Sequence, residues 1–259
     1  MTIWPEHLDH FSTTALATFL EQADRPVVLW PVGSVEPHGP HLPLGTDTLI
    51  SKHNAEEALR KLRAEGVQAV IAPALPYGVT DFAAGFAGAV SVPAPILVGL
   101  ITACVTAWLS EGFAHVSLIN HHLEPGQLKA LATARREIAS AHGKHTISAP
   151  AVTSSRWGRR LTPEFKSGAC HAGCYETSLI LATSPALVDM DAATALPSIP
   201  VSLSEAIKAG QQTFVEAGMS EAYTGAPGAA TEDEGHATYS LHGDMVATEV
   251  LEALEARLS

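Results

Sequence analysis

The sequence predicts an α/β fold in which a single domain forms a three-layer αβα sandwich around a mostly parallel central sheet. Short apolar runs bounded by turn residues alternate with amphipathic stretches of helical length, a pattern typical of βαβ units. The chain has 259 residues, of which 46% are hydrophobic, and this suits one large core better than two small ones. We therefore expect residues 1–259 to form one domain.

The apolar runs predict four strands, which are Val27–Val32, Val67–Ala72, Val116–Ile119 and Thr146–Ala149. The amphipathic stretches predict seven helices, near Thr13–Gln22, Thr46–Glu65, Ala94–Ser110, Gly126–Ala141, Cys174–Thr183, Ser202–Val215 and Ser240–Leu258. Residues 77–91 are rich in glycine and alanine, and residues 219–236 are polar and acidic, so both intervals predict long loops within the domain.

The charge balance argues against two classes of partner. The net charge is -12, whereas binding to a nucleic acid or to an anionic membrane requires a concentrated basic surface. The only short basic cluster is Arg156, Arg159 and Arg160. The first residues lack the pattern of a signal peptide, and we expect no apolar run of about 18 residues to span a bilayer. We therefore expect a soluble cytoplasmic protein.

The three cysteines, Cys104, Cys170 and Cys174, form a sparse and odd set that is typical of a reducing compartment. The spacing of Cys170 and Cys174 leaves a metal-binding pair open, but the sequence has no matching second pair.

Residues 36–47 carry four metal-capable side chains, Glu36, His38, His41 and Asp47, among three prolines and two glycines. Glu36 and His38 are two apart, so an extended backbone would place them on one side. Asp47 comes at the start of a predicted helix and could bridge two cations or could cap that helix. His38, taken alone, would more often be a satisfied buried or surface histidine than a ligand, but the cluster around it favours a ligand role.

Two further clusters carry imidazoles and carboxylates. His122 and Glu124 share the two-residue spacing after the strand that ends near Ile119, and we assign His121 to holding the loop. The third cluster contains His171 and Glu176, and Glu176 could also be a solvated carboxylate in the first turn of a helix. Because loops that leave the carboxyl ends of parallel strands meet in one crevice, the clusters can form a single site.

These segments together resemble the creatininase family of metal-dependent amidohydrolases. The most specific part runs from Pro31 to Asp47, and it is supported by Asn120–Glu124, by His171–Ser178, and by Gly243-Asp244 followed by Ala247-Thr248. The resemblance covers nearly the whole chain, and it implies a creatininase-like fold. Relatives form ring-like homo-oligomers, commonly hexamers, so the resemblance also implies assembly.

The resemblance implies a dinuclear centre with Asp47 shared between two divalent ions. One ion would be held by Glu36, Asp47 and His122, and the other by His38, Asp47 and Glu176. Zinc is the leading candidate, with manganese or iron as alternatives, because the donors are a mixture of nitrogen and oxygen. A water shared between the ions would become a hydroxide nucleophile near neutral pH.

The resemblance also implies roles for residues around the ions. His171 would act as the acid/base that protonates the leaving nitrogen, a task that suits an imidazole. Glu124 would lie beside a second water or a substrate nitrogen, although its spacing from His122 leaves a ligand role open. Trp157 could supply an aromatic wall, and the nearby arginines could bind a carboxylate or phosphate or simply lie on the surface.

Three departures from creatinine amidohydrolase argue against creatinine as the substrate. Leu123 stands where that enzyme has tyrosine, Cys170 where it has glutamate, and Ser167 where it has a tryptophan that closes over a flat ring. We therefore assign Leu123, Cys170 and Trp157 to the substrate-binding surface and leave the substrate open.

The sequence thus predicts an amidohydrolase that opens a C–N bond, other than a peptide bond, in a small amide, lactam, cyclic imide or formamide. Three alternatives stay open: a dinuclear phosphoesterase, a maturase that cleaves peptides, and a metal-binding family member without turnover. The sequence lacks a glycine-rich phosphate cradle near the ligands, which disfavours the phosphoesterase.

Overall fold

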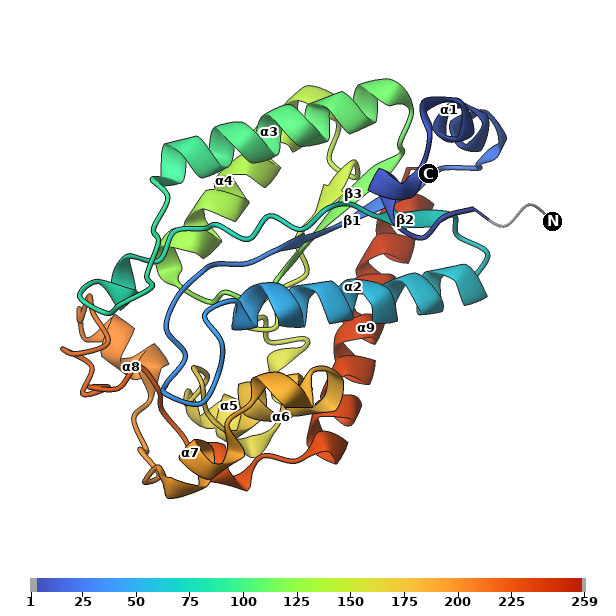
Figure 1. Cartoon of the computed structure of the whole chain (residues 1–259). Helices are drawn as coiled ribbons and strands as arrows, with labels where there is room; N and C mark the ends of the chain where they lie inside the picture. The colour runs from blue at the N-terminus through green and yellow to red at the C-terminus, as the bar shows by residue number, and fades with distance from the viewer. Residues whose placement is uncertain (1–3, 258–259) are drawn as a thin grey trace.

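A computed structural model describes residues 4–257 and shows a four-stranded parallel sheet between two layers of helices (Figure 1). The strands are β1 (Val27–Val32), β2 (Ala69–Ile71), β3 (His115–Asn120) and β4 (Ile147–Ser148), and their order in the sheet is β2-β1-β3-β4. The predicted α/β class and parallel sheet are confirmed. Strands β2 and β4 are shorter than the apolar runs that predicted them.

Alternate side chains of β1 enter different cores, as the two-residue period of a strand requires. Val27 and Leu29 pack into one core, and Val28, Trp30 and Val32 pack into the other. The first core also holds side chains of α2 (Thr46–Ala64), α6 (Cys174–Thr183) and α9 (Glu232–Glu255). The second core holds side chains of α1 (Thr13–Gln22), α3 (Ala94–Glu111) and α4 (Pro125–His142). Both faces of the sheet are therefore covered.

The last helix begins earlier than predicted. Its N-cap is Thr231, whose hydroxyl accepts a hydrogen bond from the backbone N–H of Glu234 at 3.2 Å. Three acidic residues follow in the first turn, where they complement the helix dipole. The interval 219–236 is therefore only partly a loop. The predicted end at Leu258 lies outside the described residues.

The region between α6 and α9 holds shorter elements than predicted. The expected helix Ser202–Val215 is reduced to α8 (Leu203–Lys208), which stops before Gly210 at a φ of +90°. Two short helices, α5 (Pro163–Ser167) and α7 (Met190–Ala195), were not predicted. In Figure 1 these short helices lie beyond α2, on the side away from α3 and α4.

The loops that follow β1 and β3 leave the sheet at the same edge. The two strands pair in parallel, and their last residues, Val32 and Asn120, lie opposite each other. Gly33 then packs against the first turn of α2, where an added Cβ would lie 2.7 Å from the backbone nitrogen of Thr48. This close approach brings Asp47 to the exit of β1.

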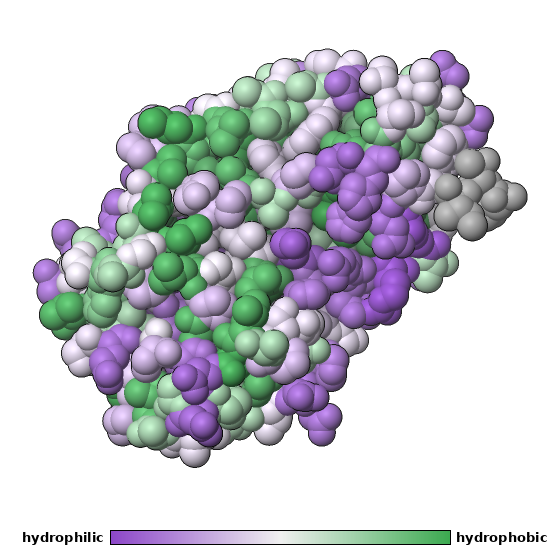
Figure 2. All heavy atoms as spheres, in the orientation of Figure 1, coloured by the Kyte–Doolittle hydropathy of each residue, from purple (hydrophilic) through white to green (hydrophobic). Residues whose placement is uncertain are grey.

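One face of α3 is apolar and exposed, with Ile96 61% and Leu100 44% accessible. Hydrophobic side chains appear along this helix at the upper left of Figure 2. Its 18 residues have a mean hydropathy of 1.6, with 17% of them buried, so by length and composition α3 could cross a membrane. The expectation that no such stretch exists is wrong for this helix. A single helix of this kind is weak grounds for a membrane span, because helices of soluble proteins pass the same test.

Candidate metal centre

Five predicted ligands meet at the carboxyl edge of the sheet. They come from the loop after β1, the first turn of α2, the loop after β3 and the first turn of α6, and they are Glu36, His38, Asp47, His122 and Glu176. All five are buried, with at most 3% of each residue exposed. Side chains distant in sequence therefore share one enclosed volume.

The donor atoms form two groups that have Asp47 in common. In the first, Nδ1 of His122 lies 3.1 Å from Oε1 of Glu36 and 3.2 Å from Oδ2 of Asp47. In the second, Nε2 of His38 lies 3.4 Å from Oδ1 of Asp47 and 3.7 Å from Oε2 of Glu176. Each oxygen of Asp47 therefore faces a different histidine, which is the arrangement expected of a bridging carboxylate.

Backbone carbonyls set the orientation of both histidines. Nδ1 of His38 donates to the carbonyl of Glu36 at 3.0 Å, and Nε2 of His122 donates to the carbonyl of Val79 at 2.6 Å. A carbonyl oxygen only accepts hydrogen bonds, so each of these ring nitrogens carries the proton. The other nitrogen of each ring is then free to bind a metal ion, as in metal sites where a second hydrogen bond orients the ligand.

The charges of the site fit a divalent cation. Nε2 of His38 is buried and has no hydrogen-bond partner among residues 4–257. Burial alone would lower the pKa of His38, but the carboxylates of Asp47, Glu176 and Glu36 outweigh it and raise the pKa to about 10. Burial raises the pKa of Glu176 to about 8. The raised pKa values show that the buried carboxylates create a negative potential that favours a bound cation. Mixed imidazole and carboxylate donors suit zinc, manganese or iron.

Hydroxyl and amide groups hold the carboxylates in place. The hydroxyl of Ser34 donates to Oδ2 of Asp47 at 2.9 Å, and the hydroxyl of Thr80 donates to Oε2 of Glu36. The backbone N–H of Ala172 donates to Oε2 of Glu176 at 2.6 Å. The ligand carboxylates are therefore oriented before any ion binds.

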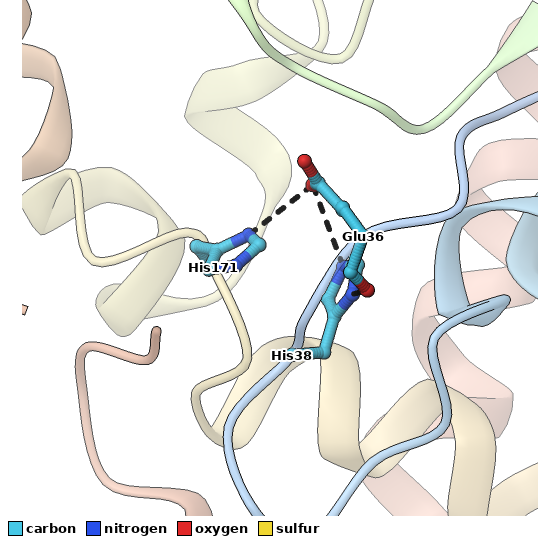
Figure 3. Close-up of side chains that lie close together, drawn as sticks. All are labelled: Glu36, His38 and His171. Carbon is cyan, nitrogen blue, oxygen red and sulfur yellow. Dashed lines mark hydrogen bonds and ion pairs between the residues drawn. The ribbon is translucent and has the colours of Figure 1, made fainter. Parts of the chain in front are cut away.

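His171 lies beside the ligands, as Figure 3 shows. Its Nδ1 is 3.8 Å from Oε1 of Glu36, and its ring is 4.5 Å from that of His38. Its Nε2 donates to the carbonyl of Pro37 at 3.0 Å, so the lone pair on Nδ1 faces the site. Burial, reinforced by the charge of His38, lowers the pKa of His171 to about 4. Glu36, His38 and His171 are also close enough to form a third potential ligand group.

Glu124 lies at the cavity wall and belongs to none of the ligand groups of residues 4–257. Its two carboxylate oxygens accept backbone hydrogen bonds from Asp81 at 3.0 Å and from Phe82 at 3.1 Å. One of them is also 3.9 Å from Nε2 of His122. Burial raises the pKa of Glu124 to about 7. Glu124 therefore joins the loop after β3 to the loop that contributes Thr80.

Glu164 anchors the segment that carries His171 and Glu176. Its carboxylate accepts backbone hydrogen bonds from Tyr175 at 3.0 Å and from Ala226 at 2.7 Å. A Cβ at Gly173 or at Gly225 would lie 2.4 Å from one of its oxygens, so both glycines are required for this approach. The sequence analysis missed Glu164, because its contact with Ala226 joins positions 62 residues apart and leaves no local signal.

A small cavity opens onto the ligands, with a volume of about 30 Å³. Leu123 and Cys170, which the sequence analysis assigned to the substrate surface, line it. Burial raises the pKa of the Cys170 thiol to about 12, so the thiol is neutral. The structure places aromatic rings here that the sequence analysis missed: Phe214 stacks on His171 with centroids 4.3 Å apart, and Phe82 lies 5.6 Å from Phe214. Phe82 lies in the short 3-10 helix Asp81–Ala83 and Phe214 in a turn, so neither periodicity nor a motif marked them.

Two other predicted side chains lie outside the ligand set. Trp157 does not reach the cavity: it is buried in the core, and its indole N–H donates to Glu249 at 2.9 Å. The expectation that it forms the aromatic wall is wrong because this hydrogen bond and the core packing hold it elsewhere. Arg156 and Arg160 stack over its ring, and Arg156 also forms an ion pair with Glu252. His121 holds its loop through a 2.9 Å hydrogen bond to Asn54.

Sequence comparison finds relatives with several different names. The chain is 34% identical over 164 residues to a mycofactocin precursor peptide peptidase of Mycolicibacterium smegmatis, covering 62% of this chain and 59% of that protein. It is 30% identical over 226 residues to the protein of the same name from Mycobacterium tuberculosis, covering 83% and 80%. It is also 30% identical over 182 residues to creatinine amidohydrolase of Pseudomonas putida, covering 64% and 67%.

Solved structures share the fold. A crystal structure of creatinine amidohydrolase superposes with a TM-score of 0.71 at 20% identity, covering 95% of this chain and 97% of the other. A structure titled "Creatininase Mn" superposes with a TM-score of 0.68 at 20% identity, covering 98% and 99%. The family model Creatininase, described as creatinine amidohydrolase, matches residues 10–250. The chain therefore belongs to the creatininase family of hydrolases.

Proposed function

We propose that this protein is a dinuclear-metal amidohydrolase that cleaves the C–N bond of a small amide, lactam, cyclic imide or formamide. The observation that carries this proposal is the pair of buried ligand groups that share Asp47 beside a neutral histidine. Glu36, Asp47 and His122 would hold one ion, and His38, Asp47 and Glu176 the other. Two zinc ions are the leading choice, and manganese or iron fits the same donors. When bound, such ions would polarise the substrate carbonyl and lower the pKa of a bound water.

His171 is the proposed proton carrier. Its Nε2 proton is committed to the carbonyl of Pro37, so Nδ1 is the atom that exchanges protons with the reacting groups. The neutral ring first accepts a proton at Nδ1 and then gives it to the departing nitrogen, as general acid–base catalysis requires. The stacked ring of Phe214 restricts the rotation of His171 and keeps Nδ1 directed toward the site.

Glu124 is proposed as a second proton-transfer group. Its pKa of about 7 suits general acid–base catalysis near neutral pH, and its carboxyl lines the cavity on the side of His122. The hydrogen bonds from Asp81 and Phe82 also let it fix the loop that bears Phe82. Leu123, Phe82 and Phe214 exclude water and orient the substrate by apolar contact. The thiol of Cys170 adds a weak hydrogen-bond donor at the same wall.

Cleavage of a peptide bond is a second candidate. It is supported by the two mycobacterial relatives, which are named for a peptidase activity on a precursor peptide. The amide chemistry is the same in both cases, because water adds across the C–N bond and the amine leaves with a proton. A dinuclear phosphoesterase is disfavoured because residues 4–257 place no arginine or lysine along the cavity.

The test is metal analysis of the native protein combined with a hydrolysis screen. The panel contains formamides, lactams, cyclic imides, short peptides and phosphate esters. We expect two metal ions per chain and turnover of amides alone, with none in the Glu36→Gln variant. Turnover of phosphate esters alone would contradict the proposal, and bound metal without turnover of any amide would identify a catalytically silent family member.

Assembly and location complete the proposal. We propose a cytoplasmic homo-oligomer, such as a hexamer, that acts on a small-molecule amide and binds neither nucleic acid nor membrane. The net charge of -12 supports the exclusion of nucleic acid. Light scattering would give the number of subunits.

A further inference from the structure

The cavity at the metal centre is too small to enclose a substrate. Its volume of about 30 Å³ is well below the range of roughly 300–1,000 Å³ that is typical of small-molecule sites. A substrate that presents its amide to the ligands must therefore extend beyond this cavity.

A larger groove adjoins the cavity. We call it the α4 groove, and it has a volume of about 250 Å³. It lies between α4 and the segment after β4, and its lining is mostly apolar: Leu118, Asn120, Leu123, Leu128, Leu131, Ala132, Arg135 and residues 149–153. Leu123 lines both the cavity and the groove, so a single side chain forms their common wall.

The groove runs along α4, away from the metal centre. Leu128, Leu131, Ala132 and Arg135 follow the spacing of one helix face. Ten residues separate Pro125, at the cavity, from Arg135, which corresponds to about 15 Å of helix. An extended peptide covers that distance with about four to five residues at roughly 3.3–3.6 Å each.

Arg135 supplies a positive charge at the far end of the groove. It is exposed, and it makes no hydrogen bond or ion pair within the part of the chain that the structure describes. Arg135 interacts electrostatically with Glu249, but the carboxylate of Glu249 already accepts a hydrogen bond from Trp157. The planar donors of an arginine at this position suit a carboxylate on a ligand.

We propose that the α4 groove binds the leaving part of a peptide substrate, about four residues with apolar side chains that end in a free carboxylate at Arg135. This inference rests on the second candidate above, cleavage of a peptide bond, and names the part of the peptide that the groove holds. Water adds its oxygen to the carbonyl carbon at the metal centre, the C–N bond breaks, and the nitrogen of the leaving peptide takes a proton. The groove binds that peptide by apolar contact and by the charge of Arg135.

The test uses the zinc-loaded protein and a mixture of N-acetylated octapeptides whose last four residues vary among Ala, Val and Leu. One set ends in a free carboxylate and a matched set ends in an amide. We expect cleavage about four residues from the C-terminus and a preference for the free carboxylate. Arg135→Gln should raise KM for the carboxylate set at least about tenfold with little change in kcat. It should not affect the amide set.

Two further variants separate binding in the groove from general effects. Arg136→Gln removes the neighbouring exposed charge, which does not line the groove, and should leave both sets unchanged. Ala132→Trp fills the groove from an exposed helix position, and it should abolish peptide cleavage while sparing formamide hydrolysis. Equal effects of Arg135→Gln and Arg136→Gln would overturn the proposal.

The outcomes distinguish the inference from the proposed function. Hydrolysis of formamides or lactams without cleavage of any peptide would refute peptide binding in the α4 groove. It would leave the proposed amidohydrolase function in place. If nothing is hydrolysed, the proposed function fails. Fluorescence polarisation with labelled, uncleaved octapeptides then tests whether the α4 groove binds a peptide. Peptide binding that is weakened by Arg135→Gln would support the proposed role of the α4 groove, whereas absence of binding would refute it.

Discussion

At the scale of single residues, the two oxygens of Asp47 determine whether the site can hold one ion or two. Each oxygen faces a different histidine, and Ser34 donates only to Oδ2. Removing a ligand from either side therefore affects a different ion. His171 differs from these ligands because its ring is stacked on Phe214 at the edge of the site.

This difference leads to a prediction about metal content. Glu36→Gln and His122→Ala should lose metal and abolish turnover, because both remove donors from the group around Asp47. His171→Ala should keep its metal and lose rate by about 10²–10⁴-fold, the usual contribution of a general acid–base group. Elemental analysis and steady-state kinetics of the three variants would check this. Equal metal loss in all three would show that His171 is a ligand.

His115 allows a prediction about stability and pH. It is fully buried, with Nδ1 donating to the carbonyl of His145 at 2.9 Å and Nε2 lying 2.8 Å from the hydroxyl of Ser148. Burial lowers the pKa of His115 to about 4, below the ordinary value of about 6.5 in an unfolded chain. The unfolded state therefore binds more protons between these values. The contribution of neutral His115 to the stability of the folded state is therefore fully present above pH 6.5, and it declines as the pH falls toward 4.

Urea unfolding at pH 7.5 and pH 5.5 should show this effect. The free energy of unfolding should fall by about 1 kcal/mol more in the wild type than in His115→Gln over this interval. The metal-free form of both proteins is used, so that metal release at low pH does not contribute. The same pH dependence in both would mean that His115 is not held in its neutral form.

At the scale of elements, α6 is the helix whose position matters most to the proposed second ion. Its first turn carries Glu176, and the carboxylate of Glu164 holds the start of the helix next to Ala226. Ala172, just before the helix, has a φ of +51° and donates to Glu176. A non-glycine residue in this conformation persists only when its surroundings fix it.

Glu164→Gln should therefore weaken binding of the ion at His38, Asp47 and Glu176. An amide keeps only one acceptor oxygen, so one of the N–H groups of Tyr175 and Ala226 would face another N–H group. We expect a loss of roughly 10–100-fold in affinity, as for other groups that orient metal ligands. Calorimetric titration should show one tight site in place of two.

The control for this experiment is Glu249→Gln. Glu249 is also a partly buried carboxylate with a raised pKa, but it is bonded to Trp157 and belongs to none of the potential ligand groups of residues 4–257. This variant should lose stability without losing metal. Identical metal titrations for Glu164→Gln and the wild type would contradict the role of Glu164.

The sequence predicted elements best where a single physical signal was strong. Strand β1 and helices α1 and α6 were predicted with their observed bounds, because apolar runs and amphipathic periodicity define them. The start of α9 was missed because its cap is a Thr followed by acidic residues, which were interpreted as a polar loop. The short helices α5 and α7 have too few turns to show periodicity.

The same contrast applies to the site. The five ligand positions were predicted because they cluster after strand ends and resemble a known family, and the structure brings them together. The aromatic part of the cavity wall was not predicted, because tertiary packing selects Phe82 and Phe214 and holds Trp157 elsewhere. A hydrogen bond between Trp157 and Glu249, which are 92 residues apart, has no local signal in the sequence.

At the scale of the whole molecule, the proposed metal ligands join parts of the chain that otherwise belong to different layers. The loops after β1 and β3, the first turn of α2 and the first turn of α6 all place carboxylates or imidazoles in one buried volume. Buried carboxylates without compensating charge destabilise the folded state, so bound cations should contribute to folding as well as to catalysis.

Removal of metal should therefore lower the melting temperature. A ligand present at 100 times its Kd stabilises the folded state by about 2.7 kcal/mol per site. For a domain of this size each kcal/mol corresponds to roughly 2–4 °C, so loss of one ion should lower Tm by about 5–10 °C and loss of two by more. Calorimetry before and after dialysis against a chelator would measure the shift, and added zinc should reverse it. The Glu36→Gln variant should respond much less, because it lacks a ligand of the first group. An unchanged Tm in the wild type would show that the carboxylates at this edge of the sheet are not compensated by bound metal.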